Sequence, residues 1–192
     1  MTFEAIIKQL ASQVSALGFI SKCGALAQIS NTTAGTGSGV LVSAQVHPFN
    51  SPGMVSISPD RKESGISFFR AQPTRITNQN VWLRQQENDV LLTVWVNGDK
   101  TKAGPDVDYS MLIQNALKRY RVQIEQGSPI RTATIEVLGD SLGEIVTGFA
   151  WDGANFRYHE HPHKLFQIRL KITCNVAQGC STATVQVINP AC

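Results

Sequence analysis

Residues 166–176 read Phe-Gln-Ile-Arg-Leu-Lys-Ile-Thr-Cys-Asn-Val. Apolar residues occupy every even position from Phe166 to Val176, and polar or charged residues occupy every odd position between them. A period of two over eleven residues predicts a β-strand with one buried face and one polar face. The buried face needs helices or a second sheet to cover it, and the rest of the chain is expected to supply that cover.

Two amphipathic helices are predicted elsewhere in the chain. In residues 3–17 the apolar side chains recur at positions i, i+3, i+4 and i+7, which is the spacing of one buried helix face. Thr2 suits the N-cap and Gly18 suits the helix stop. A second helix is expected at about residues 109–120. Its cap is Asp106 or Asp108, and its apolar stripe comprises Leu112, Ile113, Ala116, Leu117 and Tyr120.

Further strands complete the predicted sheet. Apolar patterns place them at residues 25–30, 39–46, 54–58, 66–69, 90–96, 132–138 and 182–188, while residues 143–151 fit either a strand or a helix. Residues 90–96 carry apolar side chains on both sides, including Leu91 and Trp95, which is typical of an interior strand or of a face buried against a partner. The expected fold class is α+β, a single domain over residues 1–192 with a mostly antiparallel β-sheet and two helices packed on it.

Composition narrows the function classes. Only 16% of the 192 residues are charged, against about 25% in typical globular proteins. A low charge content is expected where much of the surface is buried in an assembly, and a monomer rich in Ser, Thr, Asn and Gln accounts for it equally well. The net charge of +3 is too small to indicate nucleic-acid binding. No apolar run approaches the ~18 residues of a membrane span and no secretory signal is visible, so we expect synthesis in the cytoplasm and no membrane partner.

Catalytic and metal-binding motifs are weak. No G-x-S-x-G or Walker sequence occurs, and the acidic pairs stand beside turn or cap signals. His159, His161 and His163 would point to one side of an extended segment, where imidazoles can bind Zn²⁺, Ni²⁺ or Cu²⁺. Pro162 interrupts that geometry and favours an edge or a loop. We therefore expect no enzyme activity, no cofactor and no metal site.

The cysteines do not form a recognisable metal or redox motif. No C-x-x-C spacing occurs among Cys23, Cys174, Cys180 and Cys192. Cys174 stands on the apolar face of the strand at residues 166–176 and is expected to be a small core residue. A disulfide between Cys180 and Cys192 would require an oxidising compartment.

Four cations lie along or just before the same strand, namely Arg157, Lys164, Arg169 and Lys171. Arg169 and Lys171 share its polar face, where a positive row could line a channel or meet an acidic partner. With Trp95, these cations are the candidates for an interface or for a lumen. A solvated strand face explains the same residues equally well.

The order of elements resembles that of a known family. A helix at residues 3–17, a strand at residues 89–96, a helix at residues 108–120 and the sequence His-Pro-His-Lys-Leu-Phe at residues 161–166 before an alternating strand carry the likeness. This order resembles the tail terminator proteins of long-tailed bacteriophages and, more loosely, the ring proteins of the head–tail neck. The Gly-rich residues 31–39 and the tail at residues 177–192 lie outside the family pattern.

The resemblance implies a structural role in the virion, with assembly in the host cytoplasm. Subunits would form a closed ring, commonly a hexamer, that caps the tail tube, docks to a neck or head-completion protein, and touches passing DNA non-specifically. A heterologous interface that closes on itself produces such a ring. The alternative from another class is a soluble β-rich binding or adhesion module for a receptor or carbohydrate. A pure sandwich should lack the two helices. A metal-dependent enzyme is the third hypothesis.

Overall fold

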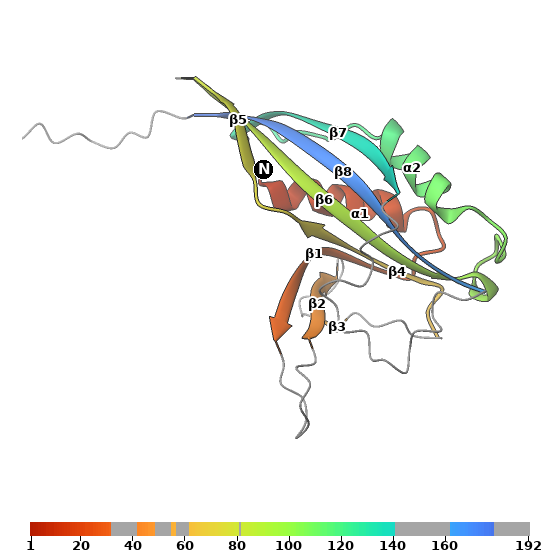
Figure 1. Ribbon diagram of the computed structural model, residues 1–192. Helices are drawn as coiled ribbons and strands as arrows, with labels where there is room; N and C mark the ends of the chain where they lie inside the picture. Colours follow the sequence, from red (N-terminus) through yellow and green to blue (C-terminus); the bar gives the residue numbers. More distant parts are fainter. Residues whose placement is uncertain (32–41, 49–54, 57–61, 81, 141–161, 179–192) are drawn as a thin grey trace, which may run out of the picture.

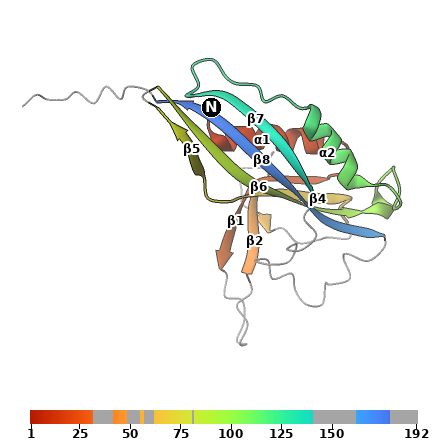
Figure 2. The ribbon, with the colours of Figure 1, turned by 45° about the horizontal axis from the view of Figure 1, so that its top comes forward.

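The computed structural model describes residues 1–31, 42–48, 55–56, 62–80, 82–140 and 162–178. In this part of the chain two α-helices lie on one face of a mostly antiparallel β-sheet, as Figures 1 and 2 show from two directions. The predicted α+β fold class is therefore confirmed.

The sheet is built around two long strands, β6 (Leu83–Asn97) and β8 (His163–Ala177), of 15 residues each. They pair antiparallel along their whole length, with Val90 opposite Leu170. Among the described strands, the order across the sheet is β3-β2-β1-β4-β6-β8-β7, and β5 also pairs with β6. The pairing of β1 with β4 is parallel. The other strands are β1 (Lys22–Asn31), β2 (Val42–Pro48), β3 (Val55–Ser56), β4 (Gly65–Ala71), β5 (Arg75–Gln79) and β7 (Ile130–Asp140).

The two central strands agree with the sequence pattern and extend beyond it. The alternating strand expected at residues 166–176 is confirmed as β8, and the strand expected at residues 90–96 is an interior strand between β4 and β8. β6 also runs back to Leu83 through a polar segment that shows no strand period. Strand β5 was not predicted, because all five of its residues are exposed and leave no apolar pattern.

Helix α1 (Phe3–Ser15) forms where its caps and stripe predict. The Thr2 hydroxyl accepts a hydrogen bond from the Ala5 N–H at 3.3 Å, which satisfies a donor that the first helical turn leaves unpaired. Just beyond the helix, Gly18 adopts a positive φ of 79°, a conformation that favours glycine. The middle of the apolar stripe is fully buried, and Phe3 and Leu17 at its ends are partly buried. The fully buried members are Ile6, Ile7, Leu10, Ala11 and Val14.

Helix α2 (Tyr109–Arg119) has the expected cap but a different buried face. Asp108 Oδ1 accepts a hydrogen bond from the Met111 N–H at 2.9 Å. The prediction that Leu112 belongs to the buried stripe is wrong, because this side chain is exposed. Tyr109 sets the rotation of the helix: its ring packs 4.8 Å from the ring of Phe19. The helix therefore buries Tyr109, Ser110, Ile113 and Leu117.

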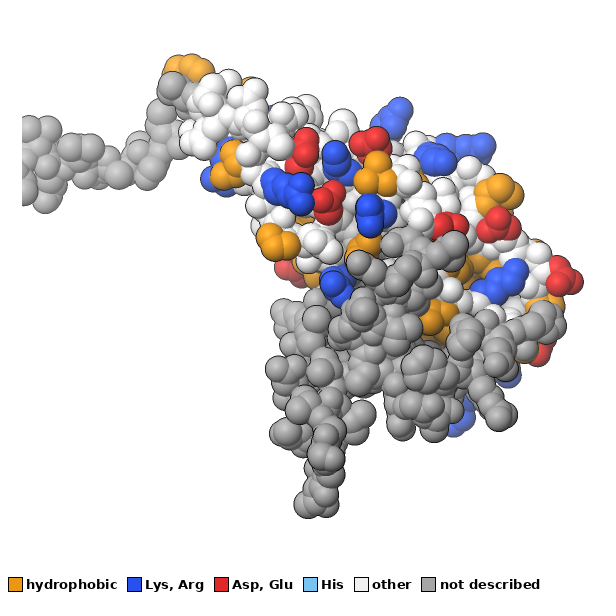
Figure 3. Space-filling model, in the orientation of Figure 1, with side chains coloured by type: hydrophobic (Ala, Val, Ile, Leu, Met, Phe, Trp, Pro, Cys, Tyr) orange, Lys and Arg blue, Asp and Glu red, His pale blue; other side chains and the backbone are white. Residues whose placement is uncertain are grey.

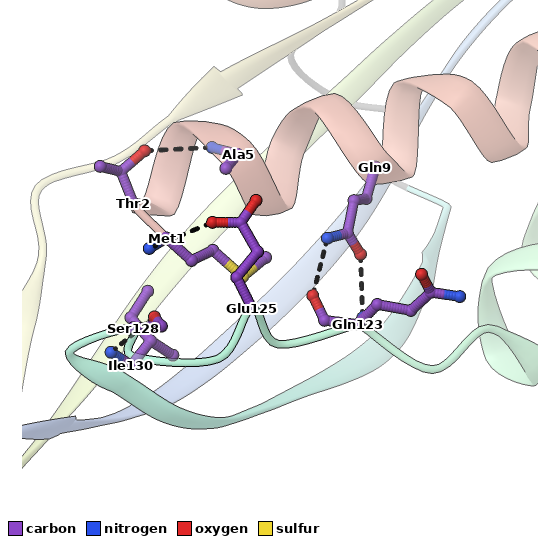
Figure 4. A network of polar contacts seen from close by, with 8 residues as sticks. All are labelled: Met1, Thr2, Ala5, Gln9, Gln123, Glu125, Ser128 and Ile130. Atoms are coloured by element: carbon purple, nitrogen blue, oxygen red, sulfur yellow. Dashed lines mark hydrogen bonds and ion pairs between the residues drawn. The ribbon is translucent and has the colours of Figure 1, made fainter.

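A side-chain bridge ties α1 to the segment between α2 and β7 (Figure 4). Gln9 Nε2 donates to the Gln123 carbonyl at 2.8 Å, and Gln9 Oε1 accepts from the Gln123 N–H at 2.9 Å. The Tyr120 hydroxyl donates to the same Gln9 oxygen at 2.8 Å. One amide thus pairs both backbone groups of Gln123, as a strand neighbour would, and holds the two helices in one layer.

The core lies between this helical layer and the sheet. β6 contributes its even-numbered apolar residues from Val90 to Val96, and β8 contributes Phe166, Ile168, Leu170 and Ile172. Cys174 is also fully buried here as a free thiol, which confirms its predicted role as a core residue.

Several predictions fall outside the described residues. These are most of the Gly-rich loop, the ambiguous segment 143–151, the strand at residues 182–188, and the side chains of Arg157, His159, His161, Cys180 and Cys192.

Candidate functional site

The sheet face turned away from α1 and α2, called the outer face here, changes character along the strands. On β6 it carries the odd-numbered residues. Leu91, Thr93 and Trp95 are buried at one end, whereas Glu87 and Asp89 at the other end remain partly accessible. The accessible end is the part of the outer face on which a partner could act.

A cavity of about 380 Å³ opens at that end. We call it the charged groove. Figure 3 shows Lys and Arg side chains beside Asp and Glu side chains over β6, β8 and β7. The groove is lined by Gln72, Arg75, Glu87, Asp89, Leu91, Leu138, Arg169 and Lys171.

The charges around the groove alternate in sign from strand to strand. Arg75 on β5 lies opposite Glu87 on β6. Asp89 on β6 lies opposite Lys171 on β8, and Lys171 lies opposite Glu136 on β7. Residues directly opposite on one face interact, and opposite charges there are favourable. Each acidic row therefore stands beside a basic row.

Lys171 forms an ion pair within the chain. Its Nζ lies 3.9 Å from Glu87 Oε2, and both side chains are about one-third exposed. A partly exposed pair of this kind contributes about 0–1 kcal/mol to stability. The carboxylate of Glu87 thus offsets part of the positive charge that Lys171 presents at the groove.

Arg169 is placed differently. In the register it faces Leu91 on one side and Gly139 on the other, neither of which is charged. Among the described residues, no carboxylate lies within 4.0 Å of its guanidinium. Gly139 sits at an irregularity of β7 with a φ of 103°. Arg169 therefore presents its charge and its five N–H donors at the groove.

Lys164 and Trp95, two other candidates from the sequence, do not line the groove. Lys164 points to the helical side, where its Nζ donates to the Val107 carbonyl at 2.8 Å and lies 5.8 Å from the centre of the Tyr109 ring. Trp95 is 1% exposed and stacks on the His163 ring with centroids 5.5 Å apart. Both residues position other elements of this chain instead of presenting a surface.

The sequence identified Arg169 and Lys171 as candidates, but it did not identify Arg75, Glu87 or Asp89, which line the same groove. Glu87 and Asp89 have odd residue numbers, as do Leu91 and Trp95. If the alternation of the strand is continued from residue 90 towards the N-terminus, both carboxylates therefore fall on the outer face. Arg75 carried no such signal, because only its pairing with β6 brings it to the groove. Glu136 lies opposite Lys171 but outside the lining of the groove.

The chemistry that the structure supports at this site is ion pairing. Within the described ranges, no three His, Cys, Asp or Glu side chains gather as metal ligands.

The two described cysteines are buried in the core, away from the groove. Burial raises the pKa of the Cys23 thiol to about 11, against the opposing effect of its hydrogen bond from Ser67. Burial likewise raises the pKa of Cys174 to about 11. Both thiols are protonated at neutral pH and pack as core groups.

The sequence matches no protein-family model and no curated protein. None of the described helices combines the length and the apolar character required to cross a membrane.

The alternating rows predict unequal effects of charge reversal. Lys171→Glu places a carboxylate beside Asp89, Glu87 and Glu136, and we expect it to lower the free energy of unfolding by about 1 kcal/mol. Arg169→Glu should change stability by much less, because its cross-strand neighbours are uncharged. Urea unfolding at low and high salt measures both variants, and salt should shrink the difference. An equal loss in the two variants would contradict this account.

Proposed function

We propose that this protein is a structural subunit of a long-tailed bacteriophage virion, acting as a tail terminator or as a head–tail joining ring. The order of its described elements supports the proposal. An N-terminal helix, a set of strands, a second helix and a closing pair of strands follow one another, with both helices on one sheet face. That order is the one on which the resemblance in the sequence depends.

The main support for the proposal is that the two faces of the sheet differ: one packs on the helices, and the other carries the charged groove. Helices α1 and α2 close one face and supply the core. The outer face retains a groove whose charged residues alternate in sign across β5, β6 and β8, and Glu136 on β7 continues the alternation beside it. Such a pattern selects a surface with the complementary order of charges and adds little affinity of its own, which suits subunits that must assemble in one register.

A β-rich binding or adhesion module is the second candidate, and the helical layer argues against it. In a sandwich the face that buries Val90 and Leu170 would pack on a second sheet. Here that face packs on α1, with Ile7 and Leu10 fully buried in the same cluster. The proposal for a ring subunit therefore has better support.

The proposed partners follow from the role. Copies of the chain would form a ring, proposed as a hexamer, between the tail tube protein and a neck or head-completion protein in the virion. Arg169 is the residue that we assign to non-specific contact with DNA or to a neighbouring subunit, because its charge faces no acidic cross-strand neighbour. Lys171 has a weaker claim, since Glu87 is beside it.

Deletion of the gene tests the role directly. A terminator occupies the growing end of the tail tube, so its loss should produce tails of uncontrolled length in electron micrographs of the lysate. Supply of the wild-type gene in trans should restore a uniform length. Tails of normal length in the deletion strain would overturn the terminator proposal, and full heads without tails would favour the joining ring.

A further inference from the structure

The hairpin formed by β5 and β6 exposes large apolar side chains. Ile76 is 53% exposed, Trp82 is 70% exposed and Leu83 is 41% exposed. These three account for half of the exposed large hydrophobic residues in the described part of the chain. We call them the hairpin tip. Figure 1 shows this end of the sheet projecting away from α2.

Hydrogen bonds pair the backbone groups of Trp82 and Leu83. Asn80 Oδ1 accepts hydrogen bonds from the N–H groups of Trp82 at 2.9 Å and of Leu83 at 2.7 Å. The Asn80 N–H donates to the Leu83 carbonyl, and the Gln178 N–H donates to the Trp82 carbonyl, each at 2.9 Å. The indole is thus exposed on a fixed support. A backbone that is already hydrogen-bonded before binding loses less entropy on association than a free one.

A second exposed apolar patch lies at the opposite end of the molecule. Met111 and Leu112 are the exposed large hydrophobic residues of α2, and we call this pair the helix patch. The beginning of α2 is anchored to the end of β7 by the hydrogen bond from the Ser110 hydroxyl to Asp140. Asp140 pairs with Ile168 on β8, whereas the hairpin tip adjoins Ala177. Nine residues of extended strand, about 30 Å, separate these positions.

The two patches differ in charge. Residues 75–84, which contain the hairpin tip, include Arg75 and Arg84 and no acidic residue. Residues 105–112, which lead into the helix patch, include Asp106 and Asp108 and no basic residue. Arg75 lies opposite Glu87, which leaves Arg84 as the basic residue beside the hairpin tip. Lys164 reaches the Val107 carbonyl beside the helix patch, where Asp106 and Asp108 still leave an excess of negative charge. The two patches are therefore opposite in net charge, and charge favours contact between unlike patches over contact between like ones.

We propose that the hairpin tip of one copy docks on the helix patch of a second copy, with Trp82 as the anchor. The contact joins two different surfaces of the same chain, so it is heterologous and head-to-tail. Repetition of one such contact closes into a ring when the rotation between copies allows it. The inference rests on the proposed function for its ring but is tested on the purified protein alone.

Mixing of two half-defective variants tests the contact. Trp82→Asp removes the hairpin tip and keeps the helix patch, whereas Leu112→Asp does the reverse. Thr134→Asp adds the same charge at an exposed residue of β7, outside both patches, and is the matched control. Both variant sites are exposed, so melting curves should show that the fold survives. Sedimentation velocity over a concentration series up to the solubility limit measures the assembly of each protein and of an equimolar mixture.

We expect the wild type and Thr134→Asp to form species larger than a dimer as the concentration rises. Each half-defective variant should stay monomeric, with self-association weakened about thirtyfold or more. Their mixture should form a heterodimer and nothing larger, because it contains one intact pair of patches. A monomeric wild type at every concentration, normal assembly of either half-defective variant, or a mixture that stays monomeric would overturn the proposal.

The outcome is independent of the virion role. Head-to-tail assembly in a protein whose deletion leaves tails normal would uphold the contact and reject the proposed function. Uncontrolled tails together with a mixture that stays monomeric would do the opposite.

Discussion

Replacement of Leu10 by alanine is expected to lower the free energy of unfolding by about 2–5 kcal/mol. Leu10 is fully buried in the middle of α1, next to Ile6 and Val14 on the stripe that packs on the sheet. Truncation removes apolar contacts and leaves a cavity that the rigid sheet beneath cannot fill. Urea denaturation followed by circular dichroism measures the change.

Leu112→Ala is the matched control for this prediction. It makes the same chemical change on the other helix, at a side chain that is 39% exposed, and should cost well under the value for Leu10. If both variants unfolded at the same urea concentration as the wild type, α1 would not be packed as described. If Leu112→Ala were as costly as Leu10→Ala, the rotation assigned to α2 would be wrong.

The second large effect is expected at Gly98, where β6 ends in a short 3₁₀ turn (Gly98–Lys100). A Cβ at this position would lie 2.5 Å from Pro105 Cα and 2.8 Å from the Pro162 carbonyl oxygen. The Gly98 N–H also donates to that carbonyl at 2.9 Å. Because both neighbours are backbone atoms, Gly98→Ala must displace the loop before α2 or the start of β8. We expect a loss of about 1–3 kcal/mol or more.

Gly104→Ala separates this steric effect from backbone strain. Gly104 has a φ of 85°, and a Cβ there would meet no atom within 4 Å. Its replacement should therefore cost only the left-handed backbone conformation, about 1 kcal/mol. Thermal unfolding of the two variants in parallel provides the comparison. A Gly98 variant as stable as the wild type would contradict the close approach.

Local signals predicted the elements that contain them. The period of two in residues 166–176 identified β8, and the cap and stripe of residues 2–17 identified α1, because strand pleat and helix turn are properties of a few consecutive residues. Residues 83–89 lacked any such signal. They are extended because β8 and β5 pair with them on either side. Strand β5 is extended because it pairs with β6.

The candidate site was predictable only in part. The parity of Arg169 and Lys171 placed both on the outer face, and the structure puts both in the charged groove. The burial of Trp95 and the turn of Lys164 toward Val107 depend on what lies above each side chain. No window of sequence around either residue contains that information.

The sequence by itself therefore determined which residues of one strand share a face, because alternation follows from backbone geometry alone. Only the tertiary structure decided which strands are neighbours, and so placed Asp89 and Glu136 on the two sides of Lys171. It also set the hairpin tip and the helix patch at opposite ends of the molecule. Strand order is chosen by the packing free energy of the whole core, a sum over residues far apart in the chain.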